Sequence, residues 1–128
     1  QKLFRKYRSY AVMKEKIPPA LRLTLEKEER FFGPGVARIL ELIEKKGSIQ
    51  GACNEMGMSY SKSWKIIKRA EKELGFHLLS SHNGGNSGGK SELTEQGSLF
   101  LARYREMEKE LTEKMEELFG QYFPQESD

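Results

Sequence analysis

Apolar residues recur every three or four positions through the middle of the chain, and this spacing predicts three helices. The first follows Gly33-Pro34-Gly35 and ends at Gly47, a residue type that favours the left-handed C-cap. The second is short, covers about 48–56 and begins at a serine. A tight turn at Gly57 then leads into the third helix, which covers about 59–74.

Alternation of apolar and polar residues predicts short strands on both sides of these helices. Three leucines alternate with polar residues over 21–26, which is typical of a half-buried strand. Residues 76–80 predict a second strand, and residues 91–93 predict a brief return strand. The glycine-rich run 83–90 lies between those two and predicts a hairpin loop.

A longer apolar stripe begins after Thr94-Glu95-Gln96-Gly97 and repeats in steps of three or four up to Tyr122. It predicts a helix from Thr94 to about Phe119, with a near-heptad seam and charged flanks. An exposed seam of this length is unusual on a monomer, so we expect a homodimer. The expected dimer-interface residues are Phe100, Tyr104, Met107, Leu111, Met115 and Leu118. The alternative is that this helix folds back on its own domain.

The order of these elements predicts a mainly α fold with a small β wing. It is that of a winged helix-turn-helix followed by a long C-terminal dimerisation helix. We expect residues 1–19 to form a basic N-terminal arm and residues 20–93 to form the winged helix-turn-helix. Residues 94–123 would then form the linker and dimerisation helix, and residues 124–128 a tail.

The net charge is only +3, but the charge is distributed unevenly along the chain. Residues 1–16 carry six basic residues against one acidic residue, and residues 59–77 carry five against two. Residues 78–128 carry ten acidic residues and only five basic ones. Positive charge therefore gathers in the arm and in the third helix, which favours a polyanion-binding surface. The alternative interpretation is a solvated charged face.

The third predicted helix is the candidate recognition helix, because the second helix of a helix-turn-helix enters the major groove of DNA. Ser63, Ile67, Ala70 and Leu74 would face the core, and Trp64, at the border of that face, is expected to pack. The candidate DNA-binding residues are Ser59, Tyr60, Ser61, Lys62, Lys65, Lys68 and Arg69 from the helix and Asn83, Asn86 and Lys90 from the wing.

These patterns predict a cytoplasmic protein that binds double-stranded DNA in a sequence-specific manner and regulates transcription. The alternative is a winged-helix protein-interaction module without DNA binding. A basic third helix favours DNA, since an interaction module would more often present an apolar or mixed-charge helix there. The single cysteine, Cys53, allows no internal disulfide and suits a small buried residue.

The sequence does not predict an enzyme, although residues 84–91 match the phosphate-binding loop pattern Gly-x-x-x-x-Gly-Lys-Ser. In that loop the Lys-Ser pair opens a helix, whereas a strand is predicted here. The only aspartate is Asp128, and neither His77 nor His82 has carboxylates at metal-binding spacing. We therefore expect no cofactor and no metal. No apolar run is long enough to span a bilayer, so we expect no membrane partner.

Three segments together resemble a known family. The runs 47–52 and 56–64, with Ser-Tyr at 59–60 and Trp64, precede a glycine-rich wing and the sequence Leu-Thr-Glu-Gln-Gly at 93–97. This combination resembles the N-terminal DNA-binding domain of the ModE molybdate-responsive regulators. It is more loosely similar to the winged helix of LysR-type regulators. The resemblance covers about residues 20–120.

The resemblance implies a dimeric, cytoplasmic repressor or activator of bacterial or archaeal type. Ser59, Tyr60, Ser61, Lys62 and Lys65 would meet DNA, with the wing beside them. Full-type ModE proteins also carry C-terminal domains that bind molybdate, and a chain of 128 residues is too short for them. We therefore expect any effector sensing to come from a separate partner. The basic arm at 1–16 is not part of the family pattern.

Overall fold

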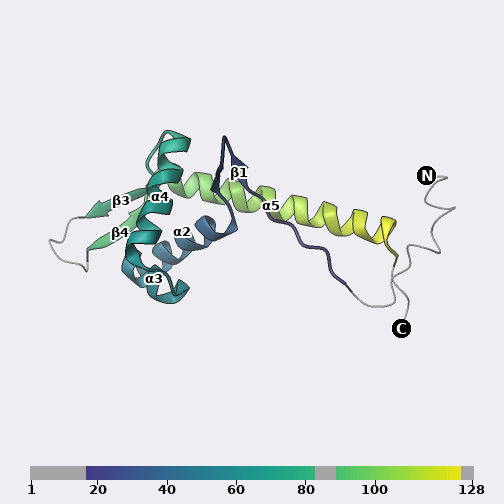
Figure 1. The fold of residues 1–128 in the computed structure, drawn as a ribbon, viewed down its shortest axis with the longest axis horizontal. Helices are drawn as coiled ribbons and strands as arrows, with labels where there is room; N and C mark the ends of the chain where they lie inside the picture. The colour runs from purple at the N-terminus through teal and green to yellow at the C-terminus, as the bar shows by residue number, and fades with distance from the viewer. Residues whose placement is uncertain (1–16, 83–88, 125–128) are drawn as a thin grey trace. The chain divides into compact units, whose positions relative to one another are not determined.

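The computed structural model describes residues 17–82 and 89–124, which are mainly helical (Figure 1). In chain order the elements are β1 (Leu25–Glu26), β2 (Arg30–Phe32), α2 (Pro34–Lys46), α3 (Ile49–Met56), α4 (Tyr60–Leu74), β3 (Leu79–His82), β4 (Lys90–Leu93) and α5 (Glu95–Tyr122). β1 pairs with β2 and β3 pairs with β4, both antiparallel. The predicted fold class, with three helices, a hairpin wing and a long final helix, is confirmed.

The chain divides into two compact units. One consists of residues Arg22–Tyr104 and contains every strand, α2 to α4 and the first turns of α5. The other consists of the flanking sequence, of which residues 17–21 and 105–124 are described. The boundary therefore falls inside α5, about ten residues later than the predicted boundary at residue 94.

Capping residues mark the ends of the three central helices and the starts of α3 and α4. The hydroxyl oxygens of Ser48 and Ser59 accept hydrogen bonds from backbone amides three residues further on, at 2.9 and 3.2 Å. Each serine thereby satisfies one of the amides that the first helical turn leaves without a partner. Gly47, Gly57 and Gly75 follow the helices with φ of 81°, 68° and 83°, a region that glycine enters without strain.

The core of the first unit consists of two clusters of buried side chains. One joins β2, α2, α4, the residue before β3 and α5 through Phe32, Ala37, Leu40, Ala70, Leu78, Leu101 and Tyr104. The other joins α2, α3 and α4 through Ile39, Leu42, Ile43, Ile49, Ala52, Cys53 and Ile67. Cys53 is a small buried residue, as predicted, and its thiol lies 3.1 Å from the hydroxyl oxygen of buried Ser63.

The structure corrects the strand predicted over 21–26. Only Leu25–Glu26 form a strand, and its partner is β2, which the sequence did not predict. Leu23 is half-buried, and its carbonyl oxygen accepts a hydrogen bond of 2.6 Å from the hydroxyl of Tyr104. The alternating leucines thus indicate burial and not a strand. The Tyr104 side chain supplies the hydrogen bond to the Leu23 carbonyl oxygen that a neighbouring strand would have made. The strand predicted over 76–80 likewise starts later, at Leu79.

The first turns of α5 belong to this core. The ring centroid of Phe32 lies 4.8 Å from that of Phe100 and 5.0 Å from that of Tyr104, both in edge-to-face geometry. Tyr104 is only 5% exposed. Phe100 and Tyr104, predicted as dimer-interface residues, therefore pack inside their own domain, where the apolar surface of β2 covers them.

Candidate nucleic-acid interface

α4 has one buried face and one exposed, basic face. Ser63, Ile67 and Ala70 are buried and Leu74 is half-buried, so the predicted core face is confirmed. Away from that face, the exposed residues are Tyr60, Ser61, Lys62, Trp64, Lys65, Lys68, Arg69 and Lys72. The structure therefore brings together on one helix all the candidate contact residues expected there, with Ser59 capping its start.

The basic side chains of this face differ in their partners. Within the described ranges, Lys62 and Lys65 have no ion-pair or hydrogen-bond partner for their ammonium groups. Lys68 forms an ion pair of 3.1 Å with Glu71, and Arg69 forms one of 2.9 Å with Glu29. Lys62 and Lys65, like Lys72 near the end of α4, are thus available to phosphate groups.

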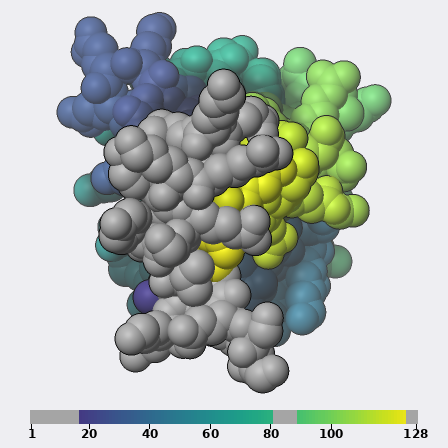
Figure 2. Space-filling model, turned by 90° about the vertical axis from the view of Figure 1, so that its right-hand side faces the viewer, coloured from purple at the N-terminus to yellow at the C-terminus, as the bar shows by residue number. Residues whose placement is uncertain are grey.

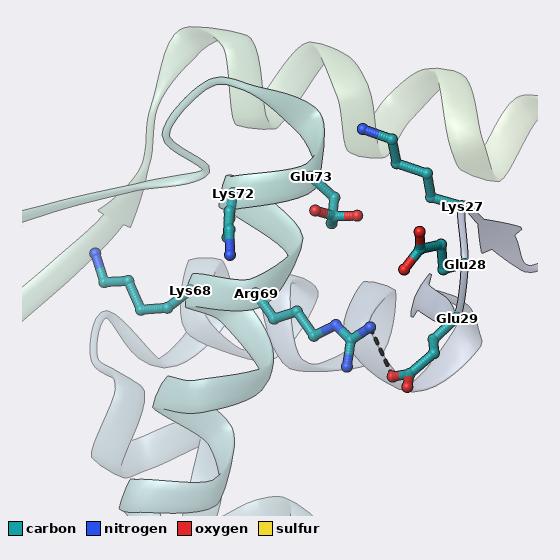
Figure 3. A pocket seen from close by; sticks show the side chains of 7 residues that line it. All are labelled: Lys27, Glu28, Glu29, Lys68, Arg69, Lys72 and Glu73. Carbon is teal, nitrogen blue, oxygen red and sulfur yellow. Dashed lines mark ion pairs between the residues drawn. The ribbon is translucent and has the colours of Figure 1, made fainter.

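Arg69 lies at a groove of about 690 Å³ between α4 and the turn that joins β1 to β2 (Figure 3). Its lining is Lys27, Glu28, Glu29, Lys68, Arg69, Lys72 and Glu73. Three carboxylates and four cations thus line the groove, and among them Arg69 is paired with Glu29. A DNA phosphate would have to compete with Glu29 for Arg69.

Trp64 differs from its prediction. We expected it to pack at the border of the core, but it is 45% exposed, as is Tyr60 one turn earlier. The ammonium group of Lys68 lies 5.4 Å from the centroid of the Trp64 ring, a cation–π distance. The helix therefore presents two aromatic side chains beside its basic face.

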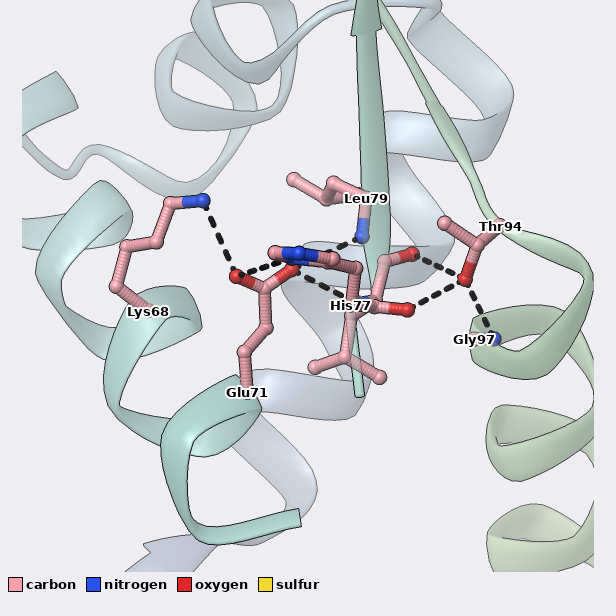
Figure 4. A network of polar contacts seen from close by, with 7 residues as sticks. Lys68, Glu71, His77, Leu79, Thr94 and Gly97 are labelled. Carbon is pink, nitrogen blue, oxygen red and sulfur yellow. Dashed lines mark hydrogen bonds and ion pairs between the residues drawn. The ribbon is translucent and has the colours of Figure 1, made fainter. Parts of the chain in front are cut away.

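Glu71 is a buried carboxylate next to the basic face that the sequence analysis missed. Its side chain is 7% exposed and accepts hydrogen bonds from the amides of Leu78 and Leu79, at 2.7 and 3.2 Å (Figure 4). The Nζ atom of Lys68 lies 3.1 Å from Oε1 of this carboxylate, and Nδ1 of His77 lies 3.6 Å from the same oxygen. Burial alone would raise the pKa of Glu71, but the two amides and Lys68 outweigh it and lower the pKa below its usual value.

This carboxylate joins the recognition helix to the base of the wing. Its only signal in the sequence is its place beside the predicted core face of α4, one turn after Ile67. A charged residue at such a position requires partners, and here they come from backbone amides of the next strand.

A second set of hydrogen bonds joins the wing to α5 through Thr94. The Thr94 hydroxyl donates to the carbonyl oxygen of His77 at 2.6 Å and accepts from the amide of Gly97 at 2.9 Å. The Thr94 amide donates to the carbonyl oxygen of Leu78 at 2.9 Å. The motif Leu-Thr-Glu-Gln-Gly thus caps α5 and ties its first turn to the residues just before β3 (Figure 4).

The β3–β4 hairpin is also tied to the turn between α2 and α3. The amide of Ser91 donates to the carbonyl oxygen of Gly47 at 2.9 Å. His82 pairs with Lys90 at the open end of the hairpin, and the Lys90 side chain is exposed. Asn83 and Asn86, the other candidate wing contacts, lie outside the described residues. Lys90 and Ser91 begin a strand, so the phosphate-binding pattern does not open a helix here.

The later turns of α5 present the rest of the predicted dimer stripe. Met107 is 53% exposed, Leu118 is exposed, and Leu111 and Met115 are half-buried. Figure 2 shows part of the end of α5, in yellow, at the surface. These four residues keep part of their surface exposed, and the dimer interface itself stays a prediction.

The described residues contain neither a cluster of metal-binding side chains nor a membrane-spanning helix. Over 17–82 and 89–124, no three His, Cys, Asp or Glu side chains gather in a way that would hold a metal ion. No helix in those ranges combines the length and the apolar character that crossing a membrane requires.

Comparison with known proteins gives a consistent result. Residues 36–98 match the family model of bacterial regulatory helix-turn-helix proteins of the LysR family. The molybdenum transport protein ModE of Azotobacter vinelandii is 33% identical over 90 residues, which cover 65% of this chain and 33% of that protein. The molybdenum-pterin-binding protein MopA of Rhodobacter capsulatus is 32% identical over 83 residues, covering 65% and 31%.

A third relative is named as a regulator. The transcriptional regulator ModE of Haemophilus influenzae is 30% identical over 88 residues, which cover 68% of this chain and 34% of that protein. The chain thus spans about a third of the length of the relatives it matches. Residues 36–98 thus form a helix-turn-helix domain of the LysR type of bacterial regulatory proteins, and about two thirds of the chain is similar to ModE regulators.

Proposed function

We propose that this chain binds double-stranded DNA in a sequence-specific manner and regulates transcription, with α4 in the major groove and the β3–β4 hairpin beside it. The observation that carries the proposal is the exposed, basic face of α4, where Lys62 and Lys65 have no partner in the described structure. The opposite face of the same helix is buried, so this helix offers only that side to a ligand. One α-helix fits the major groove.

Different residues of this face would contribute to the affinity for DNA and to the recognition of its base sequence. Lys62 and Lys65 would contact phosphates, which supply most of the affinity and its dependence on salt. Ser59, Tyr60 and Ser61 lie in the first turn, from which base edges are usually reached. From the wing, Lys90 and the two asparagines at 83 and 86 would contact the backbone or the minor groove. This is a binding function, and we propose no catalytic one.

The test begins with footprinting on DNA upstream of the protein's own gene, followed by titrations at several salt concentrations. Replacing Lys62 and Lys65 with Ala should flatten the slope of log K against log salt by about 1 for each phosphate group that the protein no longer neutralises. Arg38→Ala is the matched control, since this exposed arginine lies on α2. An unchanged affinity and slope in the double variant would refute the placement of α4 in the groove.

We further propose that two copies of the chain pair through the later turns of α5. Met107, Leu111, Met115 and Leu118 follow helical spacing along one side of the helix and leave apolar surface exposed. Two domains related by a twofold axis would read a roughly palindromic site. Tyr104, which is buried in the core, and Phe100, which packs against the core, are not part of this proposed interface.

Leu111→Asp would place a charge in this interface, favour monomers and weaken DNA binding, while the fold persists. Ala102→Asp adds the same charge at an exposed position of the same helix and should leave the dimer intact. Sedimentation of both variants beside the parent measures the outcome. A parent that is monomeric at tens of micromolar, or a Leu111→Asp variant that stays dimeric, would rule out this interface.

As a bacterial DNA-binding regulator, the protein would act in the cytoplasm, where the DNA lies. Sensing of an effector by a separate partner stays a prediction. So does the expectation that molybdate leaves the DNA affinity of this chain unchanged when it acts alone. Titrating molybdate into the DNA-binding assay measures that directly.

A further inference from the structure

We propose that a second groove, between β2, the start of α2 and the first turns of α4, binds a small organic anion with a compact apolar body, such as an aromatic carboxylate. We also propose that the bound anion competes with DNA for Lys62. The proposed binding of the anion depends only on the groove, whereas the proposed competition also rests on the proposed DNA-binding function.

The groove has a volume of about 590 Å³, which lies within the usual range of roughly 300–1,000 Å³ for small-molecule sites. Its walls come from four parts of the unit Arg22–Tyr104: the segment before β1, the junction of β2 and α2, the turn after α3, and α4. It lies on the side of α4 that carries Lys62 and Ile66.

The floor of the groove is apolar and only half covered. Met56, Met58 and Ile66 are half-buried and pack against the cluster that contains Ile39 and Ile67. They close this side of the core but keep part of their surface in contact with solvent. A ligand with an apolar body would bury that surface, and methionine side chains adapt readily to the shape of a ligand.

The polar lining of the groove is positive. Arg22, Arg30 and Lys62 contribute to it and no acidic residue does. None of these three side chains has an ion-pair or hydrogen-bond partner in the part of the chain that the structure describes. α2, whose first turn borders the groove, has no acidic residue in that turn, and its N-terminal end adds to the positive potential.

The groove of Figure 3 gives the contrast, because three glutamates line it together with its cations and one of them pairs with Arg69. Unbalanced positive charge above an apolar floor is complementary to an anion that has an apolar body. A DNA phosphate would satisfy the charge but would leave Met56, Met58 and Ile66 exposed. The combination therefore favours an organic anion over the DNA backbone.

Lys62 connects this groove to DNA binding, because it lies on the basic face of α4 and also lines the groove. When its ammonium group pairs with a bound carboxylate, it is less available to a phosphate. The ligand should therefore weaken DNA binding several-fold, and by reciprocity DNA should weaken ligand binding by the same factor.

The first experiment uses the full chain and three probes: benzoate, its neutral analogue benzyl alcohol, and inorganic phosphate. In ¹⁵N-correlated spectra, benzoate should shift the amide signals of Met58, Lys62 and Ile66 in a saturable manner. Benzyl alcohol should bind at least several-fold more weakly, and phosphate should not saturate these shifts. Arg30→Gln should lower the benzoate affinity several-fold, whereas Arg38→Gln, an exposed arginine on α2 outside the groove, should not.

Absence of saturable benzoate shifts at millimolar concentrations would overturn the proposal. So would equal binding of benzyl alcohol, since the cations would then have no role. If benzoate fails to bind but Arg30→Gln weakens DNA binding, the groove is a contact for the DNA backbone and not an anion site. Benzoate shifts confined to residues outside the groove would also overturn it.

The second experiment repeats the DNA titration in saturating benzoate and in benzyl alcohol. The DNA dissociation constant should rise several-fold to a plateau with benzoate only, and Lys62→Ala should abolish that rise. Benzoate binding without any change in DNA affinity would overturn the competition. A parent chain that binds no DNA would instead overturn the proposed function, while the spectra would still decide whether the anion binds.

Discussion

Gly97 is the position where a single methyl group should disturb the domain most clearly. It lies in the first turn of α5, and its amide donates to the Thr94 hydroxyl. A Cβ atom at this glycine would lie 3.0 Å from the Cα of Leu78 and 3.1 Å from its carbonyl carbon, and closer still to its carbonyl oxygen. These are backbone atoms at the base of the wing, so no side-chain rotation can relieve the contact.

The expected cost follows from this geometry. Forcing one extra carbon into a packed site usually costs about 1–3 kcal/mol. The shift would also strain the bonds from Thr94 to the carbonyl oxygens of His77 and Leu78, each worth roughly 1 kcal/mol. The helix preference for alanine returns at most about 1 kcal/mol. We therefore expect Gly97→Ala to lower the free energy of unfolding by about 2 kcal/mol.

For a domain of this size, such a reduction lowers the melting temperature by roughly 10 °C. Thermal and urea unfolding followed by circular dichroism measure it. Gly35→Ala is the control, because a Cβ at that α2 glycine would have no atom within 4 Å and its variant should be at least as stable as the parent. A Gly97→Ala variant with parental stability would refute the close approach of α5 to β3.

Three further outcomes are expected. Glu71→Gln should cost about 1–3 kcal/mol at neutral pH, because buried amides lose a charged acceptor. Folding lowers the pKa of Glu71, so the parent should lose stability as the pH falls below about 4.5, and the Glu71→Gln variant should lose less. Equal acid sensitivity of the two proteins in urea titrations would contradict this. Glu29→Gln breaks an exposed ion pair, so the free energy of unfolding should change by less than about 1 kcal/mol. Because Arg69 is then free to contact a phosphate, DNA should bind more tightly. Weaker DNA binding would argue against Arg69 as a phosphate contact. Calorimetric titration with Mg-ATP should be silent because Lys90 begins a strand, and micromolar binding abolished by Lys90→Ala would contradict it.

The helices could be predicted because their signals are local. Ser48 and Ser59 provide caps, Gly47 and Gly57 provide left-handed ends, and the periodicity between them gives the buried face. These interactions join residues close in sequence, so a pattern along the chain is enough to identify them. The resemblance of the same region to ModE-type regulators depends on the same residues.

Long-range contacts account for what the sequence did not reveal. The apolar stripe of α5 has the same spacing whether it packs on its own domain or on a second copy, and only the structure shows that Tyr104 contacts β2. Strands as short as β1 and β2 carry too few residues for an alternating pattern. Likewise, the pairing of Arg69 with Glu29 joins residues 40 positions apart, which charge counts along the chain cannot detect.

The buried position of Cys53 has a practical use. It is the only cysteine of the chain and is 1% exposed, between α3 and α4. A thiol-specific reagent therefore reacts only after these two helices separate, and the rate of labelling reports the free energy of that opening. No cysteine has to be introduced, so the labelling rate of the unmodified protein measures how often the helix-turn-helix opens. Labelling with and without operator DNA would measure how firmly the bound duplex holds the two helices together.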